Sequence, residues 1–227
     1  MRSKSLAYLV VALVGFSLLA GCVRRTAPAG RPASAATDAA TSAVAFLDKT
    51  FIVAPFTIPA TDADLLSGYL PTSRAVPEMV PAHLDAVLDQ ALAGSKHNFA
   101  PAKMAASCAK TASRGDESGR LATMHYWQNV GKCAGADYVL VPMVIDWHER
   151  VGSEIGSTNP ASVNMILYLV DVRTGGIVKA FHFDETQQSL SANLLDAGKF
   201  VSRHGRWLTA IELTQEGLKQ GLTELGL

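Results

Sequence analysis

The fold of this protein is decided by VNMILYLVDV (residues 163–172), RTGG (173–176) and IVKAFHFDET (177–186). The first segment is apolar on both alternating faces until Asp171, a pattern typical of a strand in the middle of a sheet. Thr174-Gly175-Gly176 predicts a tight turn, so the third segment returns as the second strand of a β-hairpin.

A further strand is expected just before this hairpin, from Tyr138 to Trp147. Pro142 removes one ladder donor from it, which favours an edge position or a bulge. Residues 152–160 are rich in Gly, Ser and Asn and are expected to form a loop. After the hairpin we expect one helix over 190–201 and a last helix that opens with a Thr209–Glu212 capping box.

The first half of the sequence predicts shorter elements around a long connection. Strands are expected at 50–56 and 98–100, and helices at 81–93, 102–112 and 118–134, the last with Leu121 on its apolar side and Gly135 as its stop. Residues 57–78 contain three prolines and predict an irregular connection, which at this length is either functional or mobile.

This order of elements predicts an α/β fold of the α+β kind. The sheet is mixed, mostly antiparallel in its second half, with helices packed on it. Residues 49–227 are expected to form a single domain.

The N-terminus has the three parts of a secretion signal. Arg2 and Lys4 precede an apolar run, and Leu19-Ala20-Gly21-Cys22 ends it with small residues before a cysteine. The sixteen uncharged residues from Leu6 to Gly21 fall short of the roughly 20 that span a bilayer. The pattern resembles bacterial lipoprotein signals, which implies cleavage after residue 21 and lipidation of Cys22.

Residues 22–48 contain mostly small residues, Pro and Thr, and predict a flexible tether behind the lipid. Val23 follows the cysteine where an Asp would favour retention in the inner membrane. By resemblance to bacterial sorting rules, the expected location is the outer membrane, facing the periplasm, with the inner membrane as the alternative.

Composition excludes some partners. Without residues 1–21, 18 Lys and Arg stand against 20 Asp and Glu, so no long-range positive field gathers nucleic acid. Cys108 and Cys133 remain as an even pair in an oxidising compartment, where a disulfide and two buried thiols are equally open alternatives.

Motifs for catalysis or cofactor binding are not found. The six histidines lack metal-ligand spacing, and a cross-strand cluster of His148 and His182 with Asp146 and Asp184 is more simply a solvated sheet face. The sequence has no nucleophile elbow and no phosphate loop, so we expect no enzyme, no metal and no cofactor.

The segment Arg203-His204-Gly205-Arg206-Trp207 places an aromatic residue beside two arginines between two expected helices. Trp and Arg are favoured at partner hot spots, so Arg203, Arg206 and Trp207 are the partner contacts that the sequence suggests. The alternative, which we favour, is that Trp207 packs under the last helix while the arginines form salt bridges at its rim.

Three segments resemble a family of envelope lipoproteins: Gly135–Val141 (GADYVLV), Leu169–Val178 (LVDVRTGGIV) and Phe51–Phe56 (FIVAPF). The resemblance is to the curli-secretion lipoprotein family, the penicillin-binding-protein activator lipoproteins and the amino-terminal domain of TolB, and it covers residues 50–225. It implies a non-enzymatic α/β domain with a role in envelope assembly. The curli channel forms its pore from added amphipathic hairpins. The segment of residues 152–162 is short and polar, so we expect no such hairpins here.

Two classes of function therefore stand. The first is a membrane-anchored periplasmic adaptor or assembly factor with a protein partner, its oligomeric state open. The second is a periplasmic hydrolase or metal-binding protein, which a closed pocket of convergent ionisable groups would favour.

Overall fold

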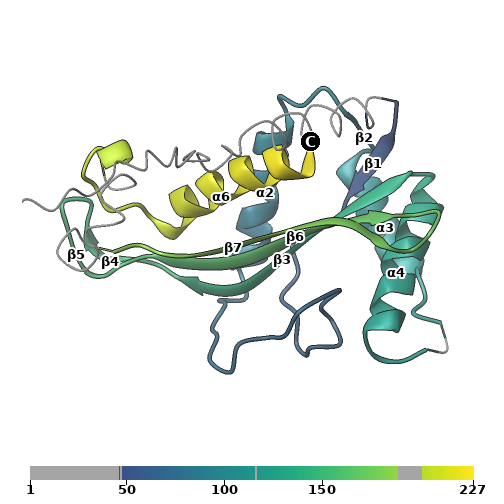
Figure 1. Ribbon diagram of the computed structural model, residues 1–227, viewed down its shortest axis with the longest axis horizontal. Helices are drawn as coiled ribbons and strands as arrows, with labels where there is room; N and C mark the ends of the chain where they lie inside the picture. The colour runs from purple at the N-terminus through teal and green to yellow at the C-terminus, as the bar shows by residue number, and fades with distance from the viewer. Residues whose placement is uncertain (1–45, 47, 116, 189–200) are drawn as a thin grey trace, which may run out of the picture. The chain divides into compact units, whose positions relative to one another are not determined.

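The computed structural model describes Phe46 and residues 48–115, 117–188 and 201–227. Its main sheet contains β1 (Thr50–Val53), β2 (Asn98–Phe99), β3 (Tyr138–His148), β6 (Ser162–Asp171) and β7 (Ile177–Thr186). The helices are α2 (Val80–Leu92), α3 (Ala102–Thr111), α4 (Gly119–Ala134) and α6 (Ala210–Leu225), and β4 (Val151–Ser153) and β5 (Gly156–Asn159) form a separate hairpin (Figure 1).

The sheet is mixed, in the order β2-β1-β3-β6-β7. β1 runs parallel to both β2 and β3, whereas β3, β6 and β7 are antiparallel to one another. The predicted α/β fold with a sheet antiparallel in its second half is therefore confirmed. β6 is a central strand, as its unbroken apolar run predicts, and β7 is an edge strand.

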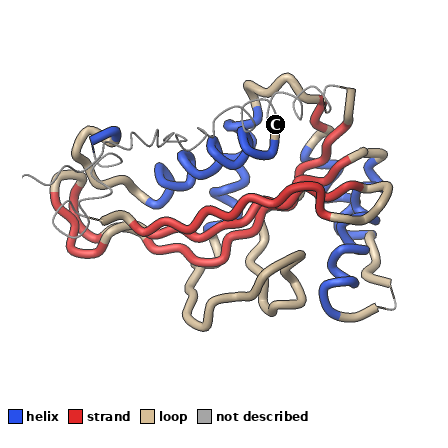
Figure 2. The backbone as a smooth tube through the Cα atoms, viewed as in Figure 1, coloured by secondary structure: helices blue, strands red, loops and turns tan. Residues whose placement is uncertain are grey.

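Helices cover both faces of this sheet, with α2 and α6 on one side and α3 and α4 on the other (Figures 1 and 2). Alternate residues of each strand supply the two cores. Leu140 and Leu167 pack with α2 and α6, while Val139 and Tyr168 face α4 and the loop between β1 and α2.

α6 lies close to the sheet because small residues face it. A Cβ atom at Gly217 would stand 2.6 Å from Met165, and one at Gly221 would stand 2.5 Å from Phe181. The predicted capping box begins this helix, since Thr209 accepts the N–H of Glu212 while the Glu212 carboxylate accepts the N–H of Thr209. Two orphan donors of the first turn are satisfied in this way.

α4 ends as predicted at Gly135, whose φ of 64° is the left-handed conformation that glycine tolerates. Trp127 and Val130 of this helix are buried, as its apolar pattern predicts, but Leu121 is not. Leu121 is 51% exposed, whereas Ala122 and Thr123 are buried. The prediction for Leu121 is wrong because α4 packs through a seam of small residues, including Gly131, where a Cβ would meet Val172 at 2.3 Å.

Pro142 lies in the centre of the sheet, not at its edge, and the register shift of β3 falls later, between Val144 and Asp146. The position of its nitrogen explains why it is tolerated. Pro142 faces β1, where the chain after Val53 is irregular and the Phe56 N–H donates to Asp85 instead of to the sheet. The Pro142 carbonyl still accepts the N–H of Thr57, so this residue keeps one bond to the chain that follows β1.

Two further predictions have different outcomes. The segment 152–160, expected as a loop, contains the β4–β5 hairpin, whose pairing of short polar strands gives no apolar alternation to detect. Most of the helix expected over 190–201 lies outside the described residues. In the part of the chain that the structure describes, no helix has the length and apolarity needed to cross a bilayer.

Candidate functional site

The connection between β1 and α2 is an ordered loop across the sheet face that α4 leaves uncovered (Figure 1). Leu65 and Leu66 are buried beneath it. Polar bonds hold the rest: the Tyr168 hydroxyl donates to the Ser67 carbonyl at 2.9 Å, and the Ala75 N–H donates to Asp146 at 2.6 Å. The loop is therefore fixed at several points, by buried leucines and by hydrogen bonds from its backbone.

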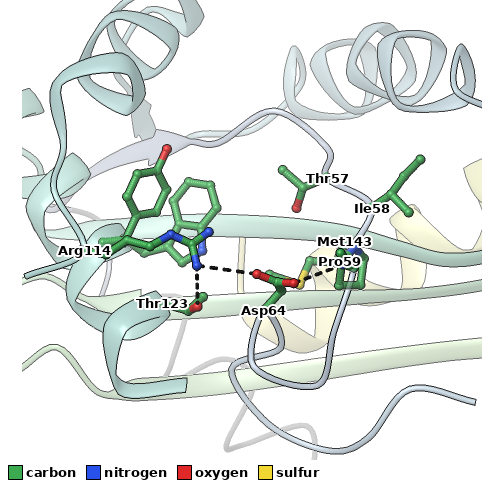
Figure 3. A pocket seen from close by; sticks show the side chains of 10 residues that line it. Thr57, Ile58, Pro59, Asp64, Arg114, Thr123 and Met143 are labelled. Atoms are coloured by element: carbon green, nitrogen blue, oxygen red, sulfur yellow. Dashed lines mark hydrogen bonds and ion pairs between the residues drawn. The ribbon is translucent and has the colours of Figure 1, made fainter. Parts of the chain in front are cut away.

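Between this loop and α4 lies an open pocket of about 420 Å³. The loop forms one wall, α4 forms another, and a β3 side chain forms the floor (Figure 3). The lining residues are Thr57, Ile58, Pro59, Ala60, Asp64, Arg114, Thr123, Tyr126, Trp127 and Met143. We call this cavity the loop–α4 pocket.

An ion pair stands at the mouth of the pocket. Nη1 of Arg114 lies 3.5 Å from Asp64 Oδ1 and 3.5 Å from the Thr123 hydroxyl, as Figure 3 shows. The guanidinium carbon lies 5.6 Å from the centre of the Tyr126 ring, within reach of a cation–π contact. Arg114 thus has an aromatic face behind it, and 56% of its side chain stays exposed.

The pocket has one carboxyl group, Asp64, and one phenol, Tyr126, and the pKa of each is shifted further from 7. Burial would raise the pKa of Asp64, but hydrogen bonds from Thr61 and Ala60, together with the charge of Arg114, outweigh it and lower the pKa. Burial raises the pKa of the Tyr126 phenol, against the opposing charge of Arg114. Asp64 is therefore a fixed anion and Tyr126 a neutral hydroxyl, and neither is poised to exchange protons near pH 7.

A second exposed feature belongs to the same loop. Tyr69 is 81% exposed and its ring lies 5.0 Å from the guanidinium carbon of Arg120 on α4. Arg120 in turn donates to the carbonyls of Asp62 and Gly68, which fixes the loop against the helix. We call Tyr69, Arg114 and Arg120 with the pocket the loop–α4 surface.

Sequence reasoning did not single out this surface. Asp64 and Arg114 are 50 residues apart and meet only because the loop folds back against α4. The one available signal was the length of the 57–78 connection, which predicts function or mobility without naming residues.

Of the predicted partner contacts, Arg203 is the most enclosed, with a side chain only 9% exposed. Its Nη2 lies 2.9 Å from Glu185 on β7 and 2.6 Å from Glu216 on α6. Burial opposes the charge of Arg203, but the two carboxylates outweigh it and raise the pKa of the guanidinium. Arg203 ties the segment before α6 to the sheet.

Arg206 and Trp207 lie close by. Arg206 is 42% exposed and pairs with Glu212 at 2.8 Å, the same carboxylate that caps α6. Trp207 is partly buried, its backbone N–H donating to the Glu154 carbonyl and its own carbonyl accepting from the Arg150 guanidinium. The two arginines thus form salt bridges at the rim of α6, as the favoured alternative expects.

Cys108 of α3 and Cys133 of α4 are joined by a disulfide, with their Cα atoms 5.7 Å apart. The sequence left open a disulfide or two buried thiols, and the structure contains the disulfide. Cys22 lies outside the described residues.

The histidines of the sheet make local contacts. His148 pairs with Asp146 of the same strand, β3, at 3.1 Å, and His182 on β7 contacts Asn164 on β6 at 2.8 Å. Within the described ranges, no three His, Cys, Asp or Glu side chains gather closely enough to hold a metal ion.

No protein-family model matches the sequence, and no curated protein matches it either. Several solved structures are similar in fold. The PelC dodecamer from Paraburkholderia phytofirmans is 15% identical over 78% of this chain and 86% of that one, with a TM-score of 0.41. Lipoprotein GNA1162 from Neisseria meningitidis is 16% identical over 69% and 94%, with a TM-score of 0.41. The LpoB C-terminal domain from Salmonella enterica is 17% identical over 61% and 83%, with a TM-score of 0.35. These values are low, so function is argued below from the residues of this chain.

Proposed function

We propose that this protein is a lipid-anchored protein of the bacterial cell envelope that binds a partner protein and catalyses no reaction. Residues 1–21 are its signal peptide, Cys22 carries the lipid, and residues 22–48 tether the domain of residues 49–227. The observation that carries the proposal is Leu19-Ala20-Gly21-Cys22 at the end of an apolar run behind two basic residues. The anchor lies in the outer membrane with the domain facing the periplasm, and the inner membrane is the alternative.

The disulfide between Cys108 and Cys133 supports a location outside the cytoplasm. Such bonds persist where the compartment is oxidising, as in the bacterial periplasm, and are rare where thioredoxin and glutathione keep thiols reduced. A secretion signal and a disulfide are independent features, and both favour the same compartment.

The loop–α4 pocket supports binding in preference to catalysis. Asp64 accepts hydrogen bonds from Ala60 and Thr61 and holds its charge, so it makes a poor general base. The pocket combines an apolar floor at Trp127 and Met143 with a partly exposed cation at Arg114. That combination suits a partner segment with an apolar side chain beside an acidic group.

An exposed tyrosine beside a half-buried arginine also favours the loop–α4 surface as the partner contact. Tyr69 and Arg120 are of the types that dominate binding energy at protein interfaces. Within this proposal, the domain acts as an adaptor or assembly factor of the kind implied by its resemblance to the curli-secretion, penicillin-binding-protein activator and TolB amino-terminal families.

Affinity purification of the full-length protein from crosslinked envelopes, followed by mass spectrometry, tests the proposal. Tyr69→Ala and Arg114→Ala should each reduce recovery of the captured partner about tenfold or more, the loss expected for a hot spot. Ile155→Ala is the matched control, because Ile155 is 88% exposed at the tip of the β4–β5 hairpin and should leave capture unchanged.

Trp207→Ala and Arg206→Ala extend the same experiment to the contacts that the sequence suggests. Equal capture by all of these variants would contradict a partner at either surface. Melting temperatures measured on each variant separate lost binding from lost folding.

A further inference from the structure

Arg114 at the mouth of the loop–α4 pocket keeps most of its hydrogen-bonding capacity. A guanidinium presents several N–H donors in a planar fork. Among the residues that the structure describes, only Nη1 has polar partners, at 3.5 Å from Asp64 Oδ1 and 3.5 Å from the Thr123 hydroxyl. Both distances exceed the roughly 2.7–3.2 Å of a good N–H···O bond. Nε and Nη2 are therefore available to a ligand, while the Tyr126 ring lies against the guanidinium.

The two oxygens of Asp64 are used unequally. Oδ2 accepts the N–H groups of Ala60 and Thr61 at 3.1 and 2.9 Å and the Thr61 hydroxyl at 3.0 Å. Within the described ranges, Oδ1 has only the long contact with Arg114. The loop thus fixes this carboxylate through one oxygen, and the other oxygen can still accept an N–H group from a ligand.

The third feature of the pocket is its apolar floor. Ile58, Trp127 and Met143 line the cavity, and Trp127 and Met143 are 5% and 2% exposed. As viewed in Figure 3, Asp64 lies between the guanidinium of Arg114 and Met143. The volume of about 420 Å³ is near the lower end of the roughly 300–1,000 Å³ typical of ligand sites. The pocket therefore has the size for the end of a chain and not for a whole helix.

The last residue of a polypeptide carries the complements of all three features on neighbouring atoms. Its carboxylate can accept parallel N–H bonds from Arg114, its backbone N–H can donate to Asp64 Oδ1, and its side chain can enter the apolar floor. An internal Asp or Glu offers a carboxylate but no apolar side chain on the same residue. A wholly apolar segment would cover Arg114 and Asp64 without giving them new partners, which costs free energy.

We propose that the loop–α4 pocket binds the free C-terminus of a partner protein that ends in an apolar residue. This inference rests on the proposed function and narrows it, since it names the part of the partner that enters the pocket. Capture of a terminal carboxylate is a recurring mode of peptide recognition that commonly uses backbone N–H groups. In this protein the fork of Arg114 supplies the donors.

Fluorescence polarisation with the full-length protein in detergent tests the proposal. The probe is a labelled Gly-Ser-Gly-Ser-Leu peptide with a free carboxylate, and the same peptide with a C-terminal amide is its matched control. A third peptide ends in Gly in place of Leu. We expect the amide and the Gly peptide each to bind about tenfold more weakly than the probe, because each lacks one of the matching groups.

Two arginine variants show whether Arg114 reads the carboxylate. Arg114→Ala should bind the probe about tenfold more weakly and should no longer distinguish it from the amide. Arg173→Ala is the matched control, because Arg173 is an exposed arginine of the turn between β6 and β7, outside the pocket. It should bind both peptides as wild type does. Melting temperatures of the two variants confirm that the compared proteins are folded.

Equal affinity of wild type for the free-carboxylate and amide peptides would overturn the proposal, and so would a lack of binding by all three peptides up to about 1 mM. Capture of an envelope partner that still depends on Arg114 would then leave the proposed function intact. Carboxylate-dependent binding of the probe without any captured envelope partner would contradict the proposed function while supporting the specificity of the pocket.

Discussion

The two faces of the five-stranded sheet are covered by different means. On the α6 face, Leu213, Leu218 and the small residues of α6 pack directly on the strands. On the opposite face, α3 and α4 cover one part, and the loop of residues 57–78 covers another, held by carboxylates and hydroxyls and by its own buried Leu65 and Leu66. Direct apolar packing covers the strands on the α6 face, whereas on the opposite face a loop held largely by polar bonds borders a pocket that contains an ion pair.

The largest expected effect comes from the same Leu→Ala truncation made on each face of the sheet. Leu218 on α6 and Leu65 in the loop both have 0% exposure. Leu218→Ala should lower the free energy of unfolding by about 4 kcal/mol, because two packed layers cannot close the cavity. Leu65→Ala should lower it by about 2 kcal/mol, since the loop can shift into the space. Urea denaturation measures both values, and a larger loss for Leu65→Ala would contradict the comparison.

The disulfide bonds the two helices of the loop face to one another. Replacing Cys108 and Cys133 together with Ala should lower the free energy of unfolding by about 3 kcal/mol, since the bond closes a segment of 25 residues in the unfolded chain. Thermal melts of wild type and variant give the loss. Alkylation of unreduced, unfolded wild-type protein should find neither thiol free, and two labelled thiols would refute the bond.

Substituting Arg203 and Arg206 one at a time shows which of the two stabilises the fold on the α6 side. Arg203→Met removes the guanidinium that pairs with the partly buried Glu185 and should lower the free energy of unfolding by about 2 kcal/mol. Arg206→Met should lower it by less than about 1 kcal/mol, because that ion pair is exposed. Chemical denaturation of both variants decides. Equal small losses would mean that Arg203 is available to a partner after all.

Acid should loosen the loop near Asp64, and this is the smallest effect of the series. The pKa of Asp64 is lowered in the folded protein, so its contribution to stability is present above the unfolded pKa of about 3.9 and is lost as the pH falls through the folded value. Hydrogen exchange at Ala60 and Thr61, which bond Asp64, should therefore accelerate in wild type over this range. Asp64→Asn should exchange faster already at neutral pH and change little with acid. A wild-type rate without this additional acceleration would contradict the role of Asp64.

Local patterns in the sequence were sufficient for most elements of the fold. The unbroken apolar run of β6, the turn at Thr174-Gly175-Gly176 and the Thr209 capping box each depend on neighbours a few residues away. The prediction from Pro142, an edge position or a bulge, was wrong. Whether a strand tolerates proline depends on the chain beside it, and the irregular chain after β1 cannot be inferred from the sequence of β3.

The candidate site was less accessible to sequence reasoning for the same physical reason. Asp64, Arg114 and Thr123 come from three separate segments and become neighbours only after the loop packs on α4. Arg203, by contrast, was predicted as a partner contact because it belongs to a short basic and aromatic segment of the sequence. Its partner Glu185 lies 18 residues away on β7, and pairing at that distance gives no local signal.

The central claim is that a lipid on Cys22 ties this domain to the envelope. Intact mass spectrometry of the mature protein extracted from membranes tests it most directly. The predicted result is a chain that begins at Cys22 and carries the added mass of acyl chains on that residue, and Cys22→Ser should lose both the added mass and the membrane association. A mature protein that begins at Met1, or one that begins at Cys22 with an unmodified thiol, would contradict the claim.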